Sequence, residues 1–169
     1  MPTGHETVAE HLLYPFHVFR FHVEFSETAL DGTPRSGTVP LCSGAFAECT
    51  GLEATMETKT IKAGGANYGA AQRVGPVTFA TVILRRGMTT TRDLWKWFAL
   101  ISAQNKYAYR LDVAITMNDH RDRPVITYRL AKALPTKFKA ADLNAKGQEI
   151  GIEEVHLVHE GLSVEAHAQ

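Results

Sequence analysis

The feature that most constrains this chain is a regular alternation of apolar and polar residues, which recurs in several separate segments. In residues 16–25, FHVFRFHVEF, every second residue from Phe19 to Phe25 is apolar. Residues 107–119 alternate in the same way, and residues 124–135 follow after a turn. A period of two is typical of strands with one buried face. The chain is therefore predicted to be mainly β, with an antiparallel hairpin spanning residues 107–135.

Three further segments are predicted to be strands. Residues 77–87, VTFATVILRRG, are rich in β-branched residues and read as a buried strand. Residues 45–62 form a weakly amphipathic strand in which Thr58 and Thr60 share a face; an exposed edge here would invite pairing with another chain. In residues 149–162 the apolar parity changes, so we expect a bulge near Glu153 and Glu154.

In one segment the apolar residues recur with the period of an α-helix. Thr90 and Asp93 have the spacing of a capping box, and the predicted helix covers about residues 91–103. Trp95 lies off its apolar stripe and is the better candidate for a contact outside the subunit. The stripe that we assign to the core is Leu94, Trp97, Phe98 and Ile101.

Two segments are predicted to be loops. Residues 26–44 are rich in Gly, Pro, Ser and Thr and suit a long loop or a loose hairpin. Residues 63–76, AGGANYGAAQRVGP, suit a long flexible loop that becomes ordered against a neighbour. This glycine-rich loop lacks the GxxxxGK[ST] pattern and precedes a strand, so it does not predict a phosphate site.

Composition excludes several classes of protein. A chain of 169 residues and 18.6 kDa has room for one domain with a real core. Eighteen Lys and Arg balance eighteen Asp and Glu, so no overall basic field favours nucleic-acid sequence recognition. The balance is uneven along the chain, because basic residues exceed acidic ones twelve to four between Arg85 and Lys139. Opposite charges on different faces would suit a molecule that stacks on copies of itself, although a solvated surface with accidental patches is the commoner case.

No residue pattern predicts catalysis, a cofactor or a metal site. Cys42 and Cys49 lack zinc-ligand spacing, and a disulfide between them is left open. His156 and His159 are expected to point to opposite faces of a strand, and His120 lies at a hairpin tip beside Asp122. The start, MPTGHETVAEHLLYPF, has no signal-peptide pattern, and no apolar run reaches the length of about eighteen residues of a membrane span. We expect folding in the bacterial cytoplasm.

The order of four sequence segments says more about function than the separate patterns do. They are ECTGLEATMETKTIKAGGAN, VTFATVILRRGMTTTRDLWKWF, PVITYRLAKALPTKF and IGIEEVHLVHEGL. Together they resemble the tail-tube family of contractile phages and phage-tail-like contractile injection systems, related to the haemolysin-coregulated protein of type VI secretion. The resemblance covers about residues 16–162. The family's SGL, LKRG and E-LELAHEGL patterns appear here with chemically mild changes, as CTGL, LRRG and VHLVHEGL.

The resemblance implies two sheets in a distorted barrel or sandwich with one flanking helix. It implies an N-terminal arm at residues 1–15, a single tail-tube domain at 16–162 and a C-terminal tail at 163–169. Hexameric rings would stack into a hollow tube, which ends in an assembled phage tail or injection particle. The implied partners are the sheath protein, baseplate and cap proteins, and effector cargo in the lumen. The residues we assign to contacts between subunits or rings are Gly64, Gly65, Asn67, Tyr68, Thr58, Thr60 and Trp95.

Three other functions remain as alternatives. One is a tube initiator or adaptor at the baseplate. Another is a small hydrolase or lyase that uses His120, or the group His156, His159 and Glu160, although no nucleophile–base spacing supports it. The last is a small-molecule-binding β-barrel lined by aromatic residues of the first strand.

Overall fold

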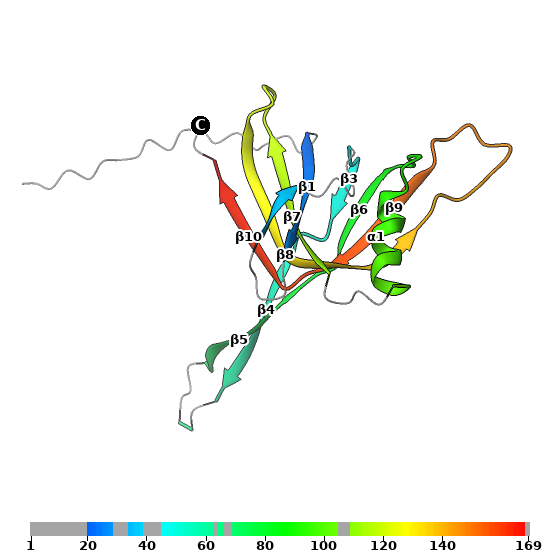
Figure 1. The fold of residues 1–169 in the computed structure, drawn as a ribbon. Coiled ribbons are helices and arrows are strands. Elements are labelled where there is room, and N and C mark those ends of the chain that lie inside the picture. The colour runs from blue at the N-terminus through cyan, green and yellow to red at the C-terminus, as the bar shows by residue number, and fades with distance from the viewer. Residues whose placement is uncertain are drawn as a thin grey trace, which may run out of the picture.

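The computed structural model describes residues 20–28, 34–38, 45–62, 64–65, 69–104 and 109–167. These residues form ten strands and one helix (Figure 1). In chain order the elements are β1 (Phe21–Thr28), β2 (Pro34–Thr38), β3 (Glu48–Thr50), β4 (Ala54–Ile61), β5 (Ala71–Phe79), β6 (Val82–Gly87), α1 (Asp93–Ser102), β7 (Arg110–Asn118), β8 (Pro124–Lys139), β9 (Ile152–Val158) and β10 (Gly161–Ala166). The mainly β class with one helix is confirmed.

Eight strands form one large antiparallel sheet, and β4 and β5 form a separate two-stranded one. The large sheet has the order β2-β1-β7-β8-β9-β6-β3, with β10 paired on β8. The first half of β8 lies between β7 and β10, whereas its second half pairs with β9. Within the described ranges β2 and β3 do not pair, so the sheet stays open and is not a closed barrel.

Strand β8 changes direction at Lys132. This residue has a φ of 51°, in the left-handed region that non-glycine residues rarely adopt. Its backbone N–H donates a hydrogen bond of 2.8 Å to Oδ1 of Asp112 on β7. The register between β7 and β8 shifts at the same place, between Leu111 and Val113. Asp112 thus stabilises the bulge that turns β8 from one half of the sheet into the other.

The core lies between the bent sheet and α1. Trp97 of the helix is fully buried and meets the ring of Phe25 edge-on, with 5.6 Å between ring centroids. Phe25 in turn packs against Phe46, as expected for the alternating first strand. The buried apolar cluster comprises Val23, Phe25, Phe46, Val82, Leu84, Leu94, Trp97, Ile101, Leu111, Val113, Ile115, Leu130, Ala133, Val155 and Leu157.

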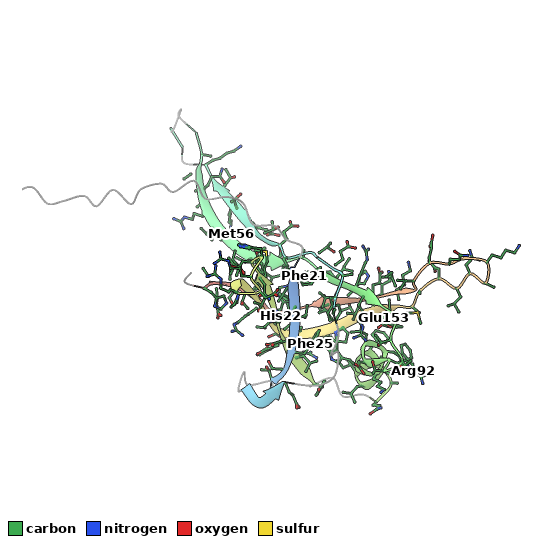
Figure 2. All side chains as sticks on the ribbon, turned by 90° about the horizontal axis from the view of Figure 1, so that it is seen from above. Phe21, His22, Phe25, Met56, Arg92 and Glu153 are labelled. Carbon is green, nitrogen blue, oxygen red and sulfur yellow. The ribbon has the colours of Figure 1, made fainter. Side chains whose placement is uncertain are left out.

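The start of the helix differs from the prediction. Its N-cap residue is Arg92, in the left-handed conformation and without a side-chain cap (Figure 2). The predicted capping box of Thr90 and Asp93 is therefore wrong, because the chain enters the helix two residues later than such a box requires. Asp93 instead lies in the first turn, where the helix dipole favours a carboxylate. Of the predicted stripe, Phe98 is half-buried.

Several predicted strands also differ in the structure. Residues 45–62 form two strands, β3 and β4, which Gly51 separates. The predicted loop 63–76 contains the first six residues of β5, which are strand because they pair with β4. The bulge expected near Glu153 and Glu154 is absent, since β9 keeps a continuous register with β6 from Ile152 to Leu157. Glu153 itself is buried on the core face, which hid the true parity of this strand.

A buried ion pair joins β6 to β9. Arg86 and Glu153 are cross-strand partners that are 1% and 3% exposed, and Nε of Arg86 donates to Oε1 of Glu153 at 2.7 Å. The guanidinium also lies 5.6 Å from the ring centroid of Phe46. Each charge is tolerated in the core because the other neutralises it.

Removing one member of this pair should be costly. We predict that Glu153→Gln lowers the free energy of unfolding by about 3–5 kcal/mol, because it leaves a buried guanidinium without its counter-charge. The matched control is Glu165→Gln, which breaks the half-exposed pair with Arg129 and should cost about 0–1 kcal/mol. Urea unfolding measures both variants. Equal losses would contradict the role given to the buried pair.

Candidate assembly surfaces

The β4–β5 hairpin extends away from the rest of the domain (Figure 1). One of its faces carries the cross-strand pairs Met56–Val77 and Thr58–Val74. Met56, Val74 and Val77 are 51%, 75% and 44% exposed, so this apolar face is largely bare in the single chain. An isolated two-stranded hairpin is marginally stable in water, and exposed apolar side chains on it indicate a binding surface.

Two glycines shape the hairpin. At Gly51, before the hairpin begins, φ is 87°, and a Cβ atom would lie 2.1 Å from the carbonyl oxygen of Thr81. At Gly75 a Cβ atom would lie 2.6 Å from the carbonyl oxygen of Glu57, where the register of β4 and β5 shifts. Both positions therefore require a residue without a side chain. Gly75 and Pro76 form a bulge opposite Glu57.

The opposite face of the hairpin is charged. Lys59 and Arg73 lie directly opposite each other across the ladder, and Glu57 lies on the same face two residues before Lys59. Like charges at such positions repel each other. In the described part of the chain, neither Lys59 nor Arg73 takes part in an ion pair. The hairpin thus has one apolar and one charged face.

The structure brings most, but not all, of the predicted contact residues together. Thr58 and Thr60 lie on the apolar side of the hairpin, where Oγ1 of Thr60 donates to Oε1 of Gln72 at 3.1 Å. Gly64 and Gly65 form a turn at its far end, with a φ of 88° at Gly65. Asn67 and Tyr68 fall outside the described residues.

Trp95 lies elsewhere, on α1, away from the hairpin tip (Figure 1). Its side chain is 48% exposed. The indole packs against Phe98 and against Phe138 of β8, with ring centroids 5.9 Å and 5.5 Å away. The contact residues predicted from the sequence therefore belong to two separate surfaces.

A third surface is the face of β1, β7, β8 and β10 that points away from the core. Its exposed side chains include Glu24, Arg129 and Glu165. The buried Thr116 and Thr127 form with His167 a chain of hydrogen bonds of 3.0 Å and 2.8 Å. His22 lies on this face, whereas its neighbour Phe21 faces the core side (Figure 2). Strand β10 pairs with β8 on one side, and the described residues provide no partner for its other edge.

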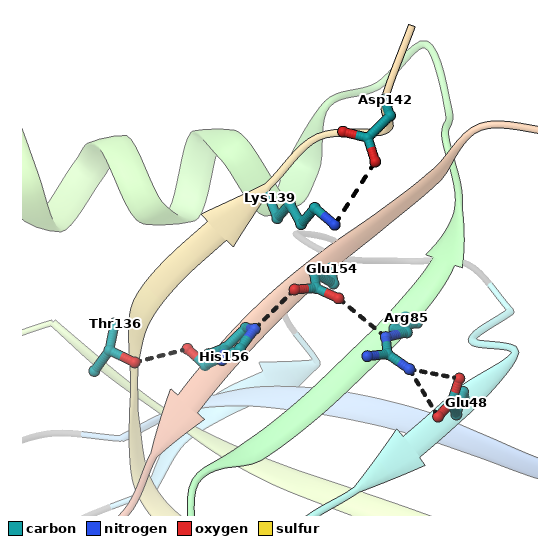
Figure 3. A network of polar contacts seen from close by, with 7 residues as sticks. All are labelled: Glu48, Arg85, Thr136, Lys139, Asp142, Glu154 and His156. Atoms are coloured by element: carbon teal, nitrogen blue, oxygen red, sulfur yellow. Dashed lines mark hydrogen bonds and ion pairs between the residues drawn. The ribbon is translucent and has the colours of Figure 1, made fainter. Parts of the chain in front are cut away.

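Arg85 is the centre of a polar network that joins three strands (Figure 3). Its Nη1 donates to both carboxylate oxygens of Glu48 at 2.9 Å, and its Nε donates to Oε2 of Glu154 at 3.0 Å. Oε1 of the same Glu154 accepts a hydrogen bond of 2.9 Å from Nε2 of His156. The network therefore clamps β3, β6 and β9 together at the edge of the sheet.

The network perturbs the ionisation of its members. The hydrogen bond from His156 and, next, that from Arg85 lower the pKa of Glu154 from 4.5 to about 2. Hydrogen bonds to Glu48 and Glu154 raise the pKa of Arg85. This network and the other ion pairs place basic residues of 85–139 directly against acidic ones from the rest of the chain. Four of the twelve basic residues in this segment, Arg85, Arg86, Arg129 and Lys132, are thus paired with acidic residues from outside it.

The chemically reactive residues are dispersed. His156 belongs to the Arg85 network, whereas His159 lies at the base of the hairpin, stacked on Phe79 with 5.0 Å between ring centroids. Burial lowers the pKa of His159, and burial raises that of the free thiol of Cys49 to about 11. His120 is exposed in the β7–β8 turn. Among the described residues, no three His, Cys, Asp or Glu side chains are grouped to hold a metal ion.

Comparison with known proteins decides the family. Residues 17–163 match the family of the T4-like virus tail tube protein gp19. The chain belongs to this tail tube family. It is therefore a structural protein of a phage-tail-like machine and not an enzyme. A search of the curated proteins finds no match.

Solved structures agree with the family in fold. A chain in the anti-feeding prophage baseplate is 23% identical, with a TM-score of 0.72 over 90% of this chain and 97% of that one. A chain in the sheath–tube complex of the extracellular contractile injection system PVC is 21% identical, with a TM-score of 0.70 over 92% and 95%. A type six secretion system protein reaches a TM-score of 0.50 at 9% identity, covering 87% and 84%. The fold is that of contractile-injection-system tube proteins. No helix in the described ranges is long and apolar enough to cross a membrane.

The low pKa of Glu154 predicts how the stability of the protein depends on pH. The native carboxylate contributes stability that is present above pH 4.5 and is lost as the pH falls toward about 2. We therefore expect Glu154→Gln to lower the melting temperature at pH 7 and to lower it progressively less between pH 4.5 and 2. Thermal unfolding of both proteins across this range measures the difference. A difference that does not change with pH would show that the carboxylate charge is irrelevant.

Proposed function

We propose that this chain is the repeating subunit of the inner tube of a contractile injection system or phage tail. In this proposal, hexameric rings stack into a hollow tube, and sheath contraction drives the tube into a target. The observation that carries the proposal is the apolar face of the β4–β5 hairpin, which projects from the domain and is bare in the single chain. Membership of the tail tube family supports it independently.

The open edges of the sheet support ring formation. Strands β2 and β10 lie at the two ends of the array β2-β1-β7-β8-β10, and unpaired strand edges favour pairing with another chain. Pairing of β10 of one subunit with the opposite end of the next is a head-to-tail contact, which closes into a ring when the rotation allows. The polar face that exposes His22, Glu24, Arg129 and Glu165 would then line the lumen. Such a surface offers cargo few apolar contacts.

We assign ring stacking to the hairpin. Thr58, Thr60, Gly64 and Gly65 lie along its exposed length, and we assign them, together with Asn67 and Tyr68, to contacts between rings. Trp95 lies on the helix side of the domain, where it is available to a different neighbour, such as the sheath. Baseplate and cap proteins would end the stack.

Electron microscopy of the purified chain over a concentration series tests the proposal. We expect six-fold rings, and tubes with an open channel at higher concentration. A persistent monomer at every concentration would contradict the proposal. Single rings that never lengthen would instead favour a tube initiator or adaptor at the baseplate.

A hairpin variant sharpens the test. Met56→Gln with Val74→Gln should leave the melting temperature of the isolated chain nearly unchanged, because both side chains are half or more exposed. The same variant should form rings but few tubes. The matched control is Met56→Leu with Val74→Ile, which keeps the face apolar and should form tubes normally. Normal tubes from the glutamine variant would remove the hairpin from the stacking contact.

A further inference from the structure

The β4–β5 hairpin is attached to the rest of the domain at a corner that it shares with the β9–β10 turn (Figure 1). Among the described residues, β4 and β5 pair only with each other and with no strand of the large sheet. The N–H of Ala80 donates to the carbonyl oxygen of Glu53 at 3.1 Å and closes the base of the hairpin. The phenyl ring of Phe79 packs on the imidazole of His159, with 5.0 Å between ring centroids. His159 therefore joins the hairpin base to the turn between β9 and β10.

The imidazole of His159 fits this corner only in its neutral form. Its Nδ1 lies 2.9 Å from the carbonyl oxygen of Gly161, and because a carbonyl can only accept, Nδ1 carries the proton and donates. The other nitrogen, Nε2, is buried and has no hydrogen-bonding partner among the described residues. In the neutral imidazole this atom is a lone pair. Protonation would turn it into a buried cationic donor without an acceptor, which is much more costly.

In the described part of the chain, no charged side chain offsets this cost. The charged groups on the elements that meet at the corner are Glu53 before β4, Lys132 on β8 and Glu160 in the turn itself. Glu160 pairs with Lys132 at 3.5 Å, and neither carboxylate is a partner of Nε2 of His159. Burial accordingly lowers the pKa of His159 from its ordinary value of 6.5, and the bond to Gly161 raises it by less.

We propose that His159 is an acid-sensitive switch that holds the base of the hairpin. While the imidazole is neutral, it packs on Phe79 and fixes the hairpin to the β9–β10 turn. After protonation, Nε2 finds an acceptor only when the imidazole leaves the corner, and this movement breaks its packing on Phe79. Because the closed corner favours the neutral form, the attachment is complete above pH 6.5 and is lost as the pH falls below it.

Nuclear magnetic resonance of the dilute, unassembled chain follows the switch directly. The chemical shifts of the His159 imidazole report its protonation between about pH 8 and about pH 5, the range over which histidines titrate. Nuclear Overhauser contacts between its protons and those of Phe79 should be present at the higher pH and lost as the imidazole becomes protonated. Contacts that persist in the protonated state, as attraction of a cation to the phenyl face would produce, overturn the inference.

The amide of Ala80 reports whether the hairpin base is released. Its hydrogen-exchange protection factor, which excludes the intrinsic pH dependence of exchange, should fall by about tenfold between the two pH values, as expected when a buried charged donor lacks an acceptor. The amides of β7 and β8 are the internal reference and should keep their protection. A fall at Ala80 no larger than that in the reference strands would show that the hairpin base does not respond to His159.

Two variants separate the charge of the imidazole from its packing. His159→Phe keeps an aromatic ring against Phe79 but cannot be protonated, so Ala80 should stay protected at both pH values. His159→Asn keeps an N–H donor for the carbonyl of Gly161 but removes the ring, so protection should be low at both. The matched control is His120→Asn, which removes an exposed imidazole from the β7–β8 turn and should keep the wild-type pH dependence. A His159→Phe chain that still loses protection in acid would assign the effect to another group.

These measurements use the single chain, so the switch is tested apart from the proposed tube function. Together the two proposals imply that the chain assembles more readily at neutral than at acidic pH. Tubes formed by a chain in which His159 stays packed on Phe79 at every pH would overturn the switch alone. A chain that shows the switch but forms neither rings nor tubes would remove the tube function and leave this inference standing.

Discussion

The bend of β8 at Lys132 is the constraint on which the rest of the structure depends. The first half of β8 holds β7 and β10, and the second half holds β9 and, through it, β6 and β3. The bend requires a left-handed backbone at a lysine, and the carboxylate of Asp112 stabilises it by accepting the lysine N–H. Because one strand serves both halves of the sheet, the core against α1 forms without closing the barrel. The sheet consequently keeps open edges that another subunit can use.

The β4–β5 hairpin differs from the bend of β8. Its large exposed side chains and its like-charged cross-strand pair do not favour a hairpin that is stable on its own. Gly51 and Gly75 nevertheless fix its shape with close backbone contacts that no other residue permits. The geometry of the hairpin is thus specified, whereas its surfaces are uncovered. We expect such a segment where a second copy of the chain completes the structure. The buried pair of Arg86 and Glu153 and the Arg85 network join β3, β6 and β9 in the body of the domain.

The sequence predicts the body of this fold better than its periphery. Strands β7 and β8, the core face of β1 and the helix follow from simple periods, because the side chains that set those periods are buried as expected. The first six residues of β5 are not predicted as strand, because residues 71–76 have no apolar stripe and become strand only by pairing with β4. In β9, the charged Glu153 occupies a core position. A rule that places charged residues on the surface therefore assigns the alternate residues of this strand to the wrong faces. The pocket beside residues 140–151, which Arg85 and Met88 also line, depends on tertiary contacts that no local pattern reports.

Hydrogen exchange along residues 54–79 tests the central claim most directly, that a second copy completes the hairpin. The amides of β4 and β5 would be compared between dilute, unassembled protein and assembled tubes, with those of β7 and β8 as the internal reference. The account predicts fast exchange in the single chain and strong protection on assembly, while the reference strands stay protected in both. Equal protection of the hairpin in the two states would show that it is complete on its own and would contradict the account.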